Sequence, residues 1–169
     1  MLIRNLDQSD AARVRALYLA VAGAPGSGLA RAPDEITPAY VQGFLARAHE
    51  SGICLGVLDG ELLVGEIHAV RMGPRQFGHV LTDLTVAVHP GYRGCGIGRQ
   101  LFQALFEAVR TLKPPVTRVE LVARSGNHVA LRLYEKLGFV REGIFCGRVI
   151  LPDGTIEDDV PMARSLDAT

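Results

Sequence analysis

Residues 93–98 have the types and the spacing of an anion-binding loop; they are Arg93, Gly94, Cys95, Gly96, Ile97 and Gly98. The segment before them, 81–88, predicts a strand, and the segment 97–112 predicts a helix. The first N–H groups of a helix have no partner within the helix, and the helix dipole attracts anions to them. Glycines at every second position leave these groups uncovered, and Arg93 adds a charged, bidentate donor. The loop therefore predicts a cradle for a pyrophosphate.

The spacing of these glycines argues against two common phosphate-binding loops. It is not Gly-x-x-x-x-Gly-Lys-Ser/Thr, the loop of P-loop NTPases, and it is not Gly-x-Gly-x-x-Gly, the loop of dinucleotide-dependent oxidoreductases. A glycine-rich turn alone is weak evidence of function, because a helix can also begin at such a turn simply to pack closely. A later segment of the chain decides between these interpretations.

That later segment covers residues 127–139. Asn127 is a good N-cap for a helix, and Gly138, followed by an apolar residue, is a typical C-terminal stop. Four residues share one helical face: Ala130, Leu133, Tyr134 and Leu137. Taken alone, the segment predicts an ordinary amphipathic helix with Tyr134 beside the core.

Together the two segments closely resemble the GNAT superfamily of acyl-CoA-dependent N-acetyltransferases. The Arg/Gln-x-x-Gly-x-Gly/Ala loop of that family corresponds to residues 93–98, and its Asn…Ala…Tyr-Glu-Lys-x-Gly-Phe helix corresponds to residues 127–139. The resemblance is strong over 83–139 and looser outside this range. It implies acetyl-CoA as cosubstrate. It also implies that the strand before the loop and the strand after its helix splay apart to admit the acyl-CoA arm.

The resemblance also implies roles for individual residues around this cleft. Val86, Ala87 and Val88 would bind the cosubstrate, with the backbone groups of Val86 and Val88 in contact with the pantetheine arm or the thioester carbonyl. Tyr134 would be the general acid for the departing CoA sulfur, because a phenol with a pKa of about 10 stays protonated at neutral pH. Besides capping its helix, Asn127 would bond the CoA arm. Arg99 is a further candidate for a phosphate contact.

The general base, which must take a proton from the attacking amine, is open between several groups. Asp83 and Glu66 are the first candidates, because each interrupts an apolar strand, and burial there would tune a carboxylate for proton transfer. His68 and Glu120 are alternatives. The carboxylates of Asp83 and Glu66 could instead lie on a solvated face of the strand or pair with arginine. Some members of the family use no single base. No pair of histidines has metal-ligand spacing, so no metal site is expected.

The length and composition of the chain limit the kinds of protein that it can be. A chain of 169 residues with 48% hydrophobic residues predicts one domain, 1–169, with a real core. A net charge of zero argues against nucleic acid as a partner, and the absence of a signal peptide or a long apolar run predicts a cytoplasmic protein without a membrane partner. Cys54 and Cys146 lie in apolar runs, which predicts that both are buried. A homodimer is the default expectation for the assembly.

The order of elements predicts the fold class. Strands are predicted at 2–6, 53–58, 61–71, 80–88, 117–123, 140–150 and 155–164, and helices at 11–22, 37–50, 97–112 and 127–137. Hairpins outnumber crossovers in this order, which indicates an α/β protein (a mixed, α+β type of sheet) with helices on both faces. The order matches the GNAT fold, in which the twisted central sheet is mostly antiparallel.

The expected reaction is transfer of an acetyl group from acetyl-CoA to a primary amine by direct attack in a ternary complex. The acceptor should be contacted and selected by the loops 23–35 and 72–78 and by the last hairpin. In that hairpin, Glu157, Asp158 and Asp159 could attract a cationic amine or form a solvated turn. A small amine or amino acid is the first choice of acceptor, and a protein N-terminus or lysine is the second. A catalytically silent acyl-CoA-binding sensor is the alternative of a different class.

Overall fold

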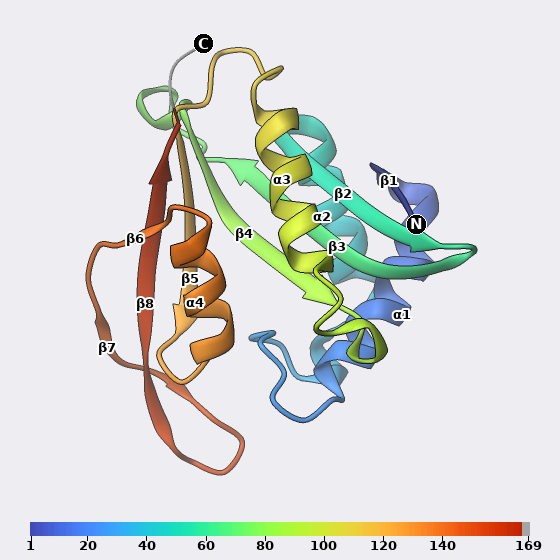
Figure 1. Cartoon of the computed structure of the whole chain (residues 1–169), viewed down its shortest axis with the longest axis vertical. Helices are drawn as coiled ribbons and strands as arrows, with labels where there is room; N and C mark the ends of the chain where they lie inside the picture. Colours follow the sequence, from blue (N-terminus) through green and yellow to red (C-terminus); the bar gives the residue numbers. More distant parts are fainter. Residues whose placement is uncertain (167–169) are drawn as a thin grey trace.

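The computed structural model describes residues 1–166 and is built around one twisted sheet (Figure 1). Its strands are β1 Leu2–Asn5, β2 Gly52–Asp59, β3 Leu62–Arg71, β4 Val80–Val88, β5 Arg118–Arg124, β6 Val140–Arg141, β7 Phe145–Ile150 and β8 Ile156–Ser165. They lie in the order β1-β2-β3-β4-β5-β8-β6, and β7 also pairs with β8. The β4–β5 pair is parallel and the other pairs are antiparallel. The predicted mixed, mostly antiparallel sheet is confirmed, while residues 167–169 of the predicted domain lie outside the described residues.

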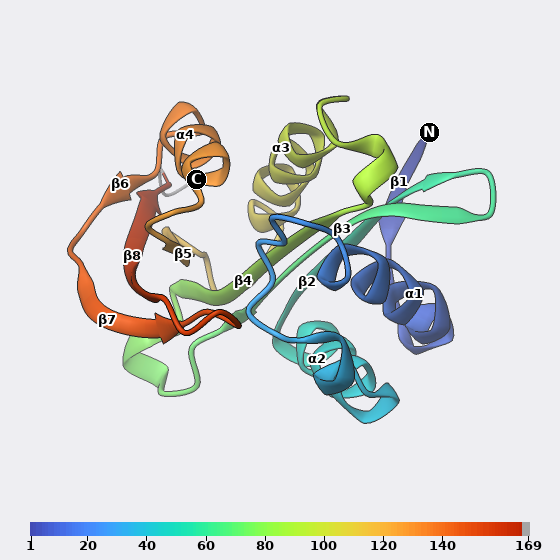
Figure 2. The ribbon, with the colours of Figure 1, turned by 90° about the horizontal axis from the view of Figure 1, so that it is seen from below.

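Helices cover both faces of the sheet, as predicted. The helices α1, Ala11–Ala22, and α2, Pro38–Ser51, pack on one face, and α3, Ile97–Val109, and α4, His128–Lys136, lie on the other (Figure 2). Each face has its own cluster of buried apolar side chains. A catalytic group on one face can therefore meet a group on the other only where the sheet itself opens. No helix within residues 1–166 has the length and apolar character needed to cross a membrane.

The sheet opens between β4 and β5. These two strands pair only at their first residues, Val80 with Arg118 and Leu81 with Val119, and then separate. Antiparallel strands flank them on the outer sides, so the separation leaves an inner strand edge unpaired along most of β4. The splay implied by the family resemblance is therefore present in the fold.

Three details differ from the prediction. The helix α3 ends at Val109, before the predicted residue 112, in a turn that precedes Pro114. The predicted strand 140–150 is two strands, β6 and β7. Opposite the break, β8 contains Pro161, whose carbonyl accepts from the Glu142 N–H but whose nitrogen has no hydrogen to donate. Cys146, predicted to be buried, is exposed on β7, whereas Cys54 on β2 is buried as predicted.

Candidate active site

The unpaired edge of β4 presents main-chain groups to the gap. The His89 N–H donates to the Val64 carbonyl at 2.9 Å, and the register pairs Ala87 with Glu66. Residues that bond the neighbouring strand alternate along an antiparallel pair, so Ala87 faces β3 and the main-chain groups of Val86 and Val88 point the other way, into the gap. Such groups can pair with an amide-containing arm as an added strand would. The main-chain groups of Val86 and Val88 thus point to where the predicted contacts would be made, whereas those of Ala87 pair with β3.

The glycine loop lies where α3 begins. Gly96 is the N-cap residue with φ of +80° and supplies no side-chain acceptor for the helix. A Cβ atom added at Gly94 or Gly96 would meet no atom within 4 Å, so the space over the loop is open. The side chain of Ile97 is buried in the core, so this residue can offer only its N–H to a ligand. Cys95 is exposed. The start of α3 therefore presents uncovered amides, as an anion cradle requires.

Arg93, Gly98 and Arg99, which were predicted to contact the phosphates or to shape their site, lie at the two ends of this loop. Arg93 is exposed, and its Nη1 donates to the Pro25 carbonyl at 3.2 Å. Arg99 is exposed in the first turn of α3, and Gly98 lets that turn pack close to α4, since a Cβ there would lie 3.4 Å from Leu133. Arg93 and Arg99 thus precede and follow the uncovered amides along the chain, and both side chains are exposed.

The first loop, 23–35, crosses from the glycine loop to the start of α4. Besides the contact with Arg93, it accepts a hydrogen bond from Arg124 Nη2 at the Ser27 carbonyl, at 2.5 Å. At Gly28 it passes so close to Asn127 that an added Cβ would lie 2.9 Å from Nδ2. Asn127 itself caps α4, since its Oδ1 accepts from the Ala130 N–H at 3.2 Å. The loop therefore lies beside several residues predicted to hold the cosubstrate, and sequence reasoning missed these contacts.

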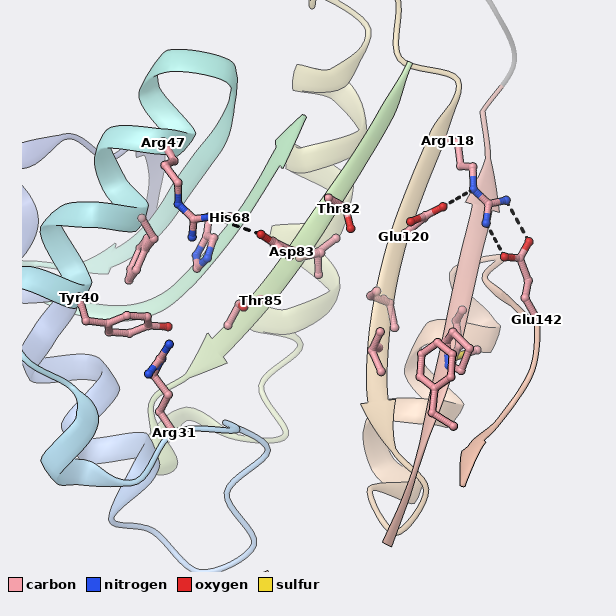
Figure 3. Close-up of a pocket in the computed structure, with 17 residues that line it drawn as sticks. Arg31, Tyr40, Arg47, His68, Thr82, Asp83, Thr85, Arg118, Glu120 and Glu142 are labelled. Carbon is pink, nitrogen blue, oxygen red and sulfur yellow. Dashed lines mark hydrogen bonds and ion pairs between the residues drawn. The ribbon is translucent and has the colours of Figure 1, made fainter. Parts of the chain in front are cut away.

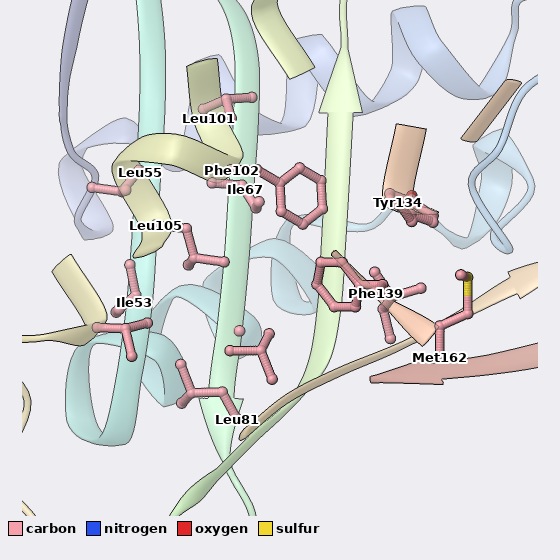
Figure 4. Packing of buried hydrophobic residues seen from close by; sticks show 14 of the residues in the cluster. Ile53, Leu55, Ile67, Leu81, Leu101, Phe102, Leu105, Tyr134, Phe139 and Met162 are labelled. Carbon is pink, nitrogen blue, oxygen red and sulfur yellow. The ribbon is translucent and has the colours of Figure 1, made fainter. Parts of the chain in front are cut away.

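Tyr134 is held rigidly on the α3/α4 side of the sheet. Its ring packs edge-on against Phe102 at a centroid distance of 5.5 Å and lies 6.0 Å from Phe139 (Figure 4). Burial raises the pKa of its hydroxyl to about 12. The phenol is therefore fully protonated at neutral pH, which is the state that a general acid needs.

A cleft of about 490 Å³ lies beside the splay, on the α1/α2 side (Figure 3). One wall comes from the first loop, α2 and β3, and contains Arg31, Tyr40, Phe44, Arg47 and His68. The middle of the cleft is formed by β4, with Thr82, Asp83, Leu84 and Thr85. The far wall comes from β5 to β8 and includes Arg118, Glu120, Glu142 and Met162. The cleft thus combines charges of both signs with apolar surface, as an acceptor site for a polar small molecule would.

Ion pairs organise both walls of this cleft. On the far wall, Arg118 lies 2.6 Å from Glu120 and also pairs with Glu142. On the near wall, Arg47 lies 3.4 Å from Asp83. Glu120, an alternative candidate for the base, is therefore bound to arginine. The predicted acidic trio 157–159 does not line the cleft.

Asp83 occupies an irregular point of β4. The pairing of β3 with β4 shifts register between His68 and Val70, and Asp83 adopts a left-handed φ of +50°. Aspartate tolerates this region better than most residues, and such strained positions concentrate at functional sites. The carboxylate is 58% exposed and reaches the cleft. Asp83 is thus accessible to an acceptor but is not buried.

Glu66 is in the opposite situation. Its side chain is wholly buried, and it lies neither on a solvated face nor against an arginine. Tyr18 donates to its Oε2 at 2.6 Å, and Cys54 Sγ donates to its Oε1 at 3.2 Å. His68 Nδ1 lies 3.0 Å from the same Oε1. Within the described part of the chain, Glu66 therefore reaches the cleft only through His68.

Known proteins resemble this chain in sequence and in fold. The family model described as "Acetyltransferase (GNAT) family" matches residues 16–139. The chain is 34% identical over 106 residues to L-2,4-diaminobutyric acid acetyltransferase from Vibrio cholerae, across 63% of this chain and 58% of the relative. It is also 34% identical over 111 residues to N-alpha-acetyltransferase RimI from Mycobacterium tuberculosis, across 66% of this chain and 65% of the relative. The chain thus covers less than two thirds of either relative.

Two solved structures share the fold over nearly the whole chain. One is an acetyltransferase of the GNAT family from Streptococcus pneumoniae, with a TM-score of 0.86 and 23% identity over 98% of this chain and 99% of that chain. The other is a GNAT superfamily phosphinothricin acetyltransferase from Sinorhizobium meliloti in complex with acetyl-CoA. Its TM-score is 0.83, with 19% identity over 98% of this chain and 88% of that chain. At these identities the likeness concerns the fold alone.

Proposed function

Because this chain belongs to the GNAT family of acetyltransferases, we propose that it transfers the acetyl group of acetyl-CoA to the primary amine of a small molecule, preferably an amino acid. The observation that carries the proposal is the unpaired edge of β4. It lies between the uncovered amides of the glycine loop on one face and the charged cleft on the other. An acyl carrier bound along this edge would bring its thioester to the amine in a ternary complex, where the amine attacks directly.

Each part of this site has a task in the reaction. The amides at the start of α3, with Arg93 and Arg99, hold the diphosphate of the cosubstrate. The main chain of Val86 and Val88 aligns the pantetheine arm and can bond the thioester carbonyl as charge develops on its oxygen. Tyr134 protonates the departing sulfur. Asp83 lies in the cleft, where its carboxylate can attract a cationic amine.

The size and charge of the cleft support a small, charged acceptor. Arg31 and Arg47 both lie on the near wall, and the guanidinium of Arg31 sits 4.2 Å above the Tyr40 ring. The Glu35 Oε1 atom lies 3.8 Å from Arg31 Nη1, beyond hydrogen-bond distance, and the other oxygen of Glu35 accepts the Ala32 N–H. A positioned guanidinium with free donors is suited to a carboxylate. An amino acid would therefore bind with its carboxylate at Arg31 and its amine deeper in the cleft.

The function is tested by release of free CoASH from acetyl-CoA in the presence of a panel of L-amino acids, diamines and short peptides. We expect the fastest release with an amino acid, and L-2,4-diaminobutyric acid belongs in the panel because a relative is named for it. Fastest release with peptides would favour the second candidate, N-terminal acetylation, which is supported by the relative named N-alpha-acetyltransferase RimI. Tight binding of acetyl-CoA without release for any amine would instead identify a sensor.

Replacing Arg31 by alanine should raise KM for an amino-acid acceptor about 10-fold or more, because a charge-assisted hydrogen bond contributes about 1.5–3 kcal/mol. The KM for the corresponding amine without a carboxylate should not change. Arg75→Ala is the matched control, since Arg75 is exposed and its loop, 72–78, does not line the cleft, although that loop was predicted to contact the acceptor. An equal effect of Arg31→Ala on both acceptors would contradict the carboxylate contact.

The cytoplasmic location and the homodimer stay predictions from the sequence.

A further inference from the structure

Among residues 1–166, His68 is the one group that links the buried polar cluster of Tyr18, Cys54 and Glu66 to the cleft. Its side chain is 4% exposed, and its ring stacks on Phe44 at a centroid distance of 4.2 Å and an interplanar angle of 11°. Its Nδ1 faces Glu66 Oε1 at 3.0 Å and the Tyr18 hydroxyl at 3.4 Å. The stacking fixes the plane of the ring, and the contacts of Nδ1 fix its rotation within that plane.

The protons of this cluster can be assigned from its donors and acceptors. Burial, together with the neighbouring Glu66, raises the pKa of the Tyr18 hydroxyl and that of the Cys54 thiol, so both stay protonated and donate to Glu66. Both oxygens of Glu66 therefore serve as acceptors for these two donors. The remaining contact of Oε1 is with His68 Nδ1, so the favourable arrangement has the hydrogen on Nδ1. This tautomer leaves a lone pair on Nε2.

The Nε2 atom reaches the cleft. Within residues 1–166, Nε2 has no hydrogen-bond partner. It is also not one of the fully buried atoms without a partner, so its surface is accessible from the cleft. His68 lines the cleft and pairs in register with Thr85, next to the open β4 edge (Figure 3). We propose that His68 is the general base of the transfer reaction and that Glu66 is a positioning residue, which holds the base in the tautomer whose Nε2 lone pair faces the acceptor amine. This inference rests on the proposed function.

The proton transfers of the step balance as follows. The nitrogen of a neutral amine attacks the thioester carbon, so a C–N bond forms and the C–S bond breaks, with its electron pair leaving on sulfur. The surplus proton of the nitrogen passes to His68 Nε2, and the sulfur takes a proton from the Tyr134 hydroxyl. The products are an N-acetyl amide and CoASH, and proton exchange with water restores both side chains. Glu66 stabilises the imidazolium without being protonated itself.

Other ionisable groups surround His68 and bear on its pH dependence. They are Glu66 on β3, Cys54 on β2, Tyr18 on α1, Tyr40 and Arg47 on α2, and Asp83 on β4. Among these, Asp83 is the competing candidate for the base. It pairs with Arg47 at 3.4 Å and is 58% exposed, whereas the imidazole is held on two sides. The roles of His68 and Asp83 must therefore be separated by experiment.

The test compares kcat/KM against pH for five proteins, the wild type and the variants His68→Gln, Glu66→Gln, His49→Gln and Asp83→Asn, with acetyl-CoA and the L-amino acid that gives the fastest CoASH release. We expect His68→Gln to lower kcat/KM about 100-fold and to remove the acidic limb of the profile. Glu66→Gln should lower kcat/KM less and move that limb to lower pH, because an amide stabilises the imidazolium less than a carboxylate does. His49→Gln, an exposed histidine of α2, is the matched control and should behave as the wild type. Calorimetric binding of acetyl-CoA by His68→Gln at wild-type affinity confirms that the variant is folded.

A wild-type profile for His68→Gln, or the same loss of its limb in Asp83→Asn instead, would overturn the proposal. A second measurement needs no acceptor. In spectra of ¹⁵N-histidine-labelled protein, His68 should show the Nδ1–H tautomer, and Glu66→Gln should change its nitrogen shifts. An Nε2–H tautomer in the wild type would also overturn it. If acetyl-CoA binds but no amine releases CoASH, the transferase function fails together with this role, whereas a wild-type rate in His68→Gln removes only the base.

Discussion

Replacing Gly96 by aspartate should raise the dissociation constant for acetyl-CoA about 100-fold. The substitution puts a carboxylate at the start of α3, where the diphosphate is proposed to bind. Two like charges about 4 Å apart near a protein surface repel by about 4 kcal/mol before salt screening, so a loss of about 2.7 kcal/mol in binding is a moderate expectation. Isothermal titration calorimetry with acetyl-CoA measures it. Arg93→Ala should have a smaller effect in the same direction, about 10-fold, through the loss of one charged donor.

Two further glycine variants separate charge from backbone strain. At Gly96, with φ of +80°, alanine introduces the strain of a left-handed residue without the charge, about 1–2 kcal/mol in stability. It should leave the affinity close to that of the wild type if the loop keeps its conformation. Gly154→Asp adds the same charge at a φ of +84° in equally open space, but in the β7–β8 turn. It should bind acetyl-CoA normally. Unchanged affinity in Gly96→Asp would show that no diphosphate binds at this loop.

Replacing Tyr134 by phenylalanine should lower kcat about 100-fold while the affinity for acetyl-CoA changes less than about 2-fold. The ring keeps its contacts with Phe102 and Phe139, and the described residues offer the hydroxyl no hydrogen-bond partner that the variant would lose. Only the proton for the departing sulfur is removed. Assays of CoASH release at saturating substrates measure kcat, and calorimetry measures the affinity for acetyl-CoA.

The pH dependence gives an independent check on the same residue. Because burial raises the pKa of Tyr134 to about 12, the phenol stays protonated well above pH 9, so its ionisation should cause no loss of rate between pH 7 and 10. Tyr92→Phe is the control variant, since the Tyr92 hydroxyl bonds Asp59 at 2.9 Å on the surface. It should keep the kcat of the wild type. A Tyr134→Phe enzyme with wild-type kcat would mean that the sulfur leaves without this acid.

The parts of the site that could be predicted are those whose signals are local in the chain. The glycine loop depends on six consecutive residues, and the helix that holds Tyr134 depends on a cap and a stop within 13 residues. Backbone conformation and capping act over a few residues, so their spacing in the sequence is also their spacing in space. Glu66 also stands out in the sequence, because a carboxylate in an apolar strand is unusual, although the sequence could not say whether water or another side chain would surround it.

The partners that give these residues their roles come from far along the chain. Tyr18 reaches Glu66 across 48 positions, Arg93 reaches Pro25 across 68, and Arg124 reaches Ser27 across 97. Phe44 orients His68 only because α2 packs over β3. The sequence by itself determined the elements, the anion loop and the class of cosubstrate. Only the tertiary structure decided that Glu66 is buried behind His68 while Asp83 is exposed, because burial and hydrogen bonding depend on which elements pack together, and nothing local in the sequence encodes that.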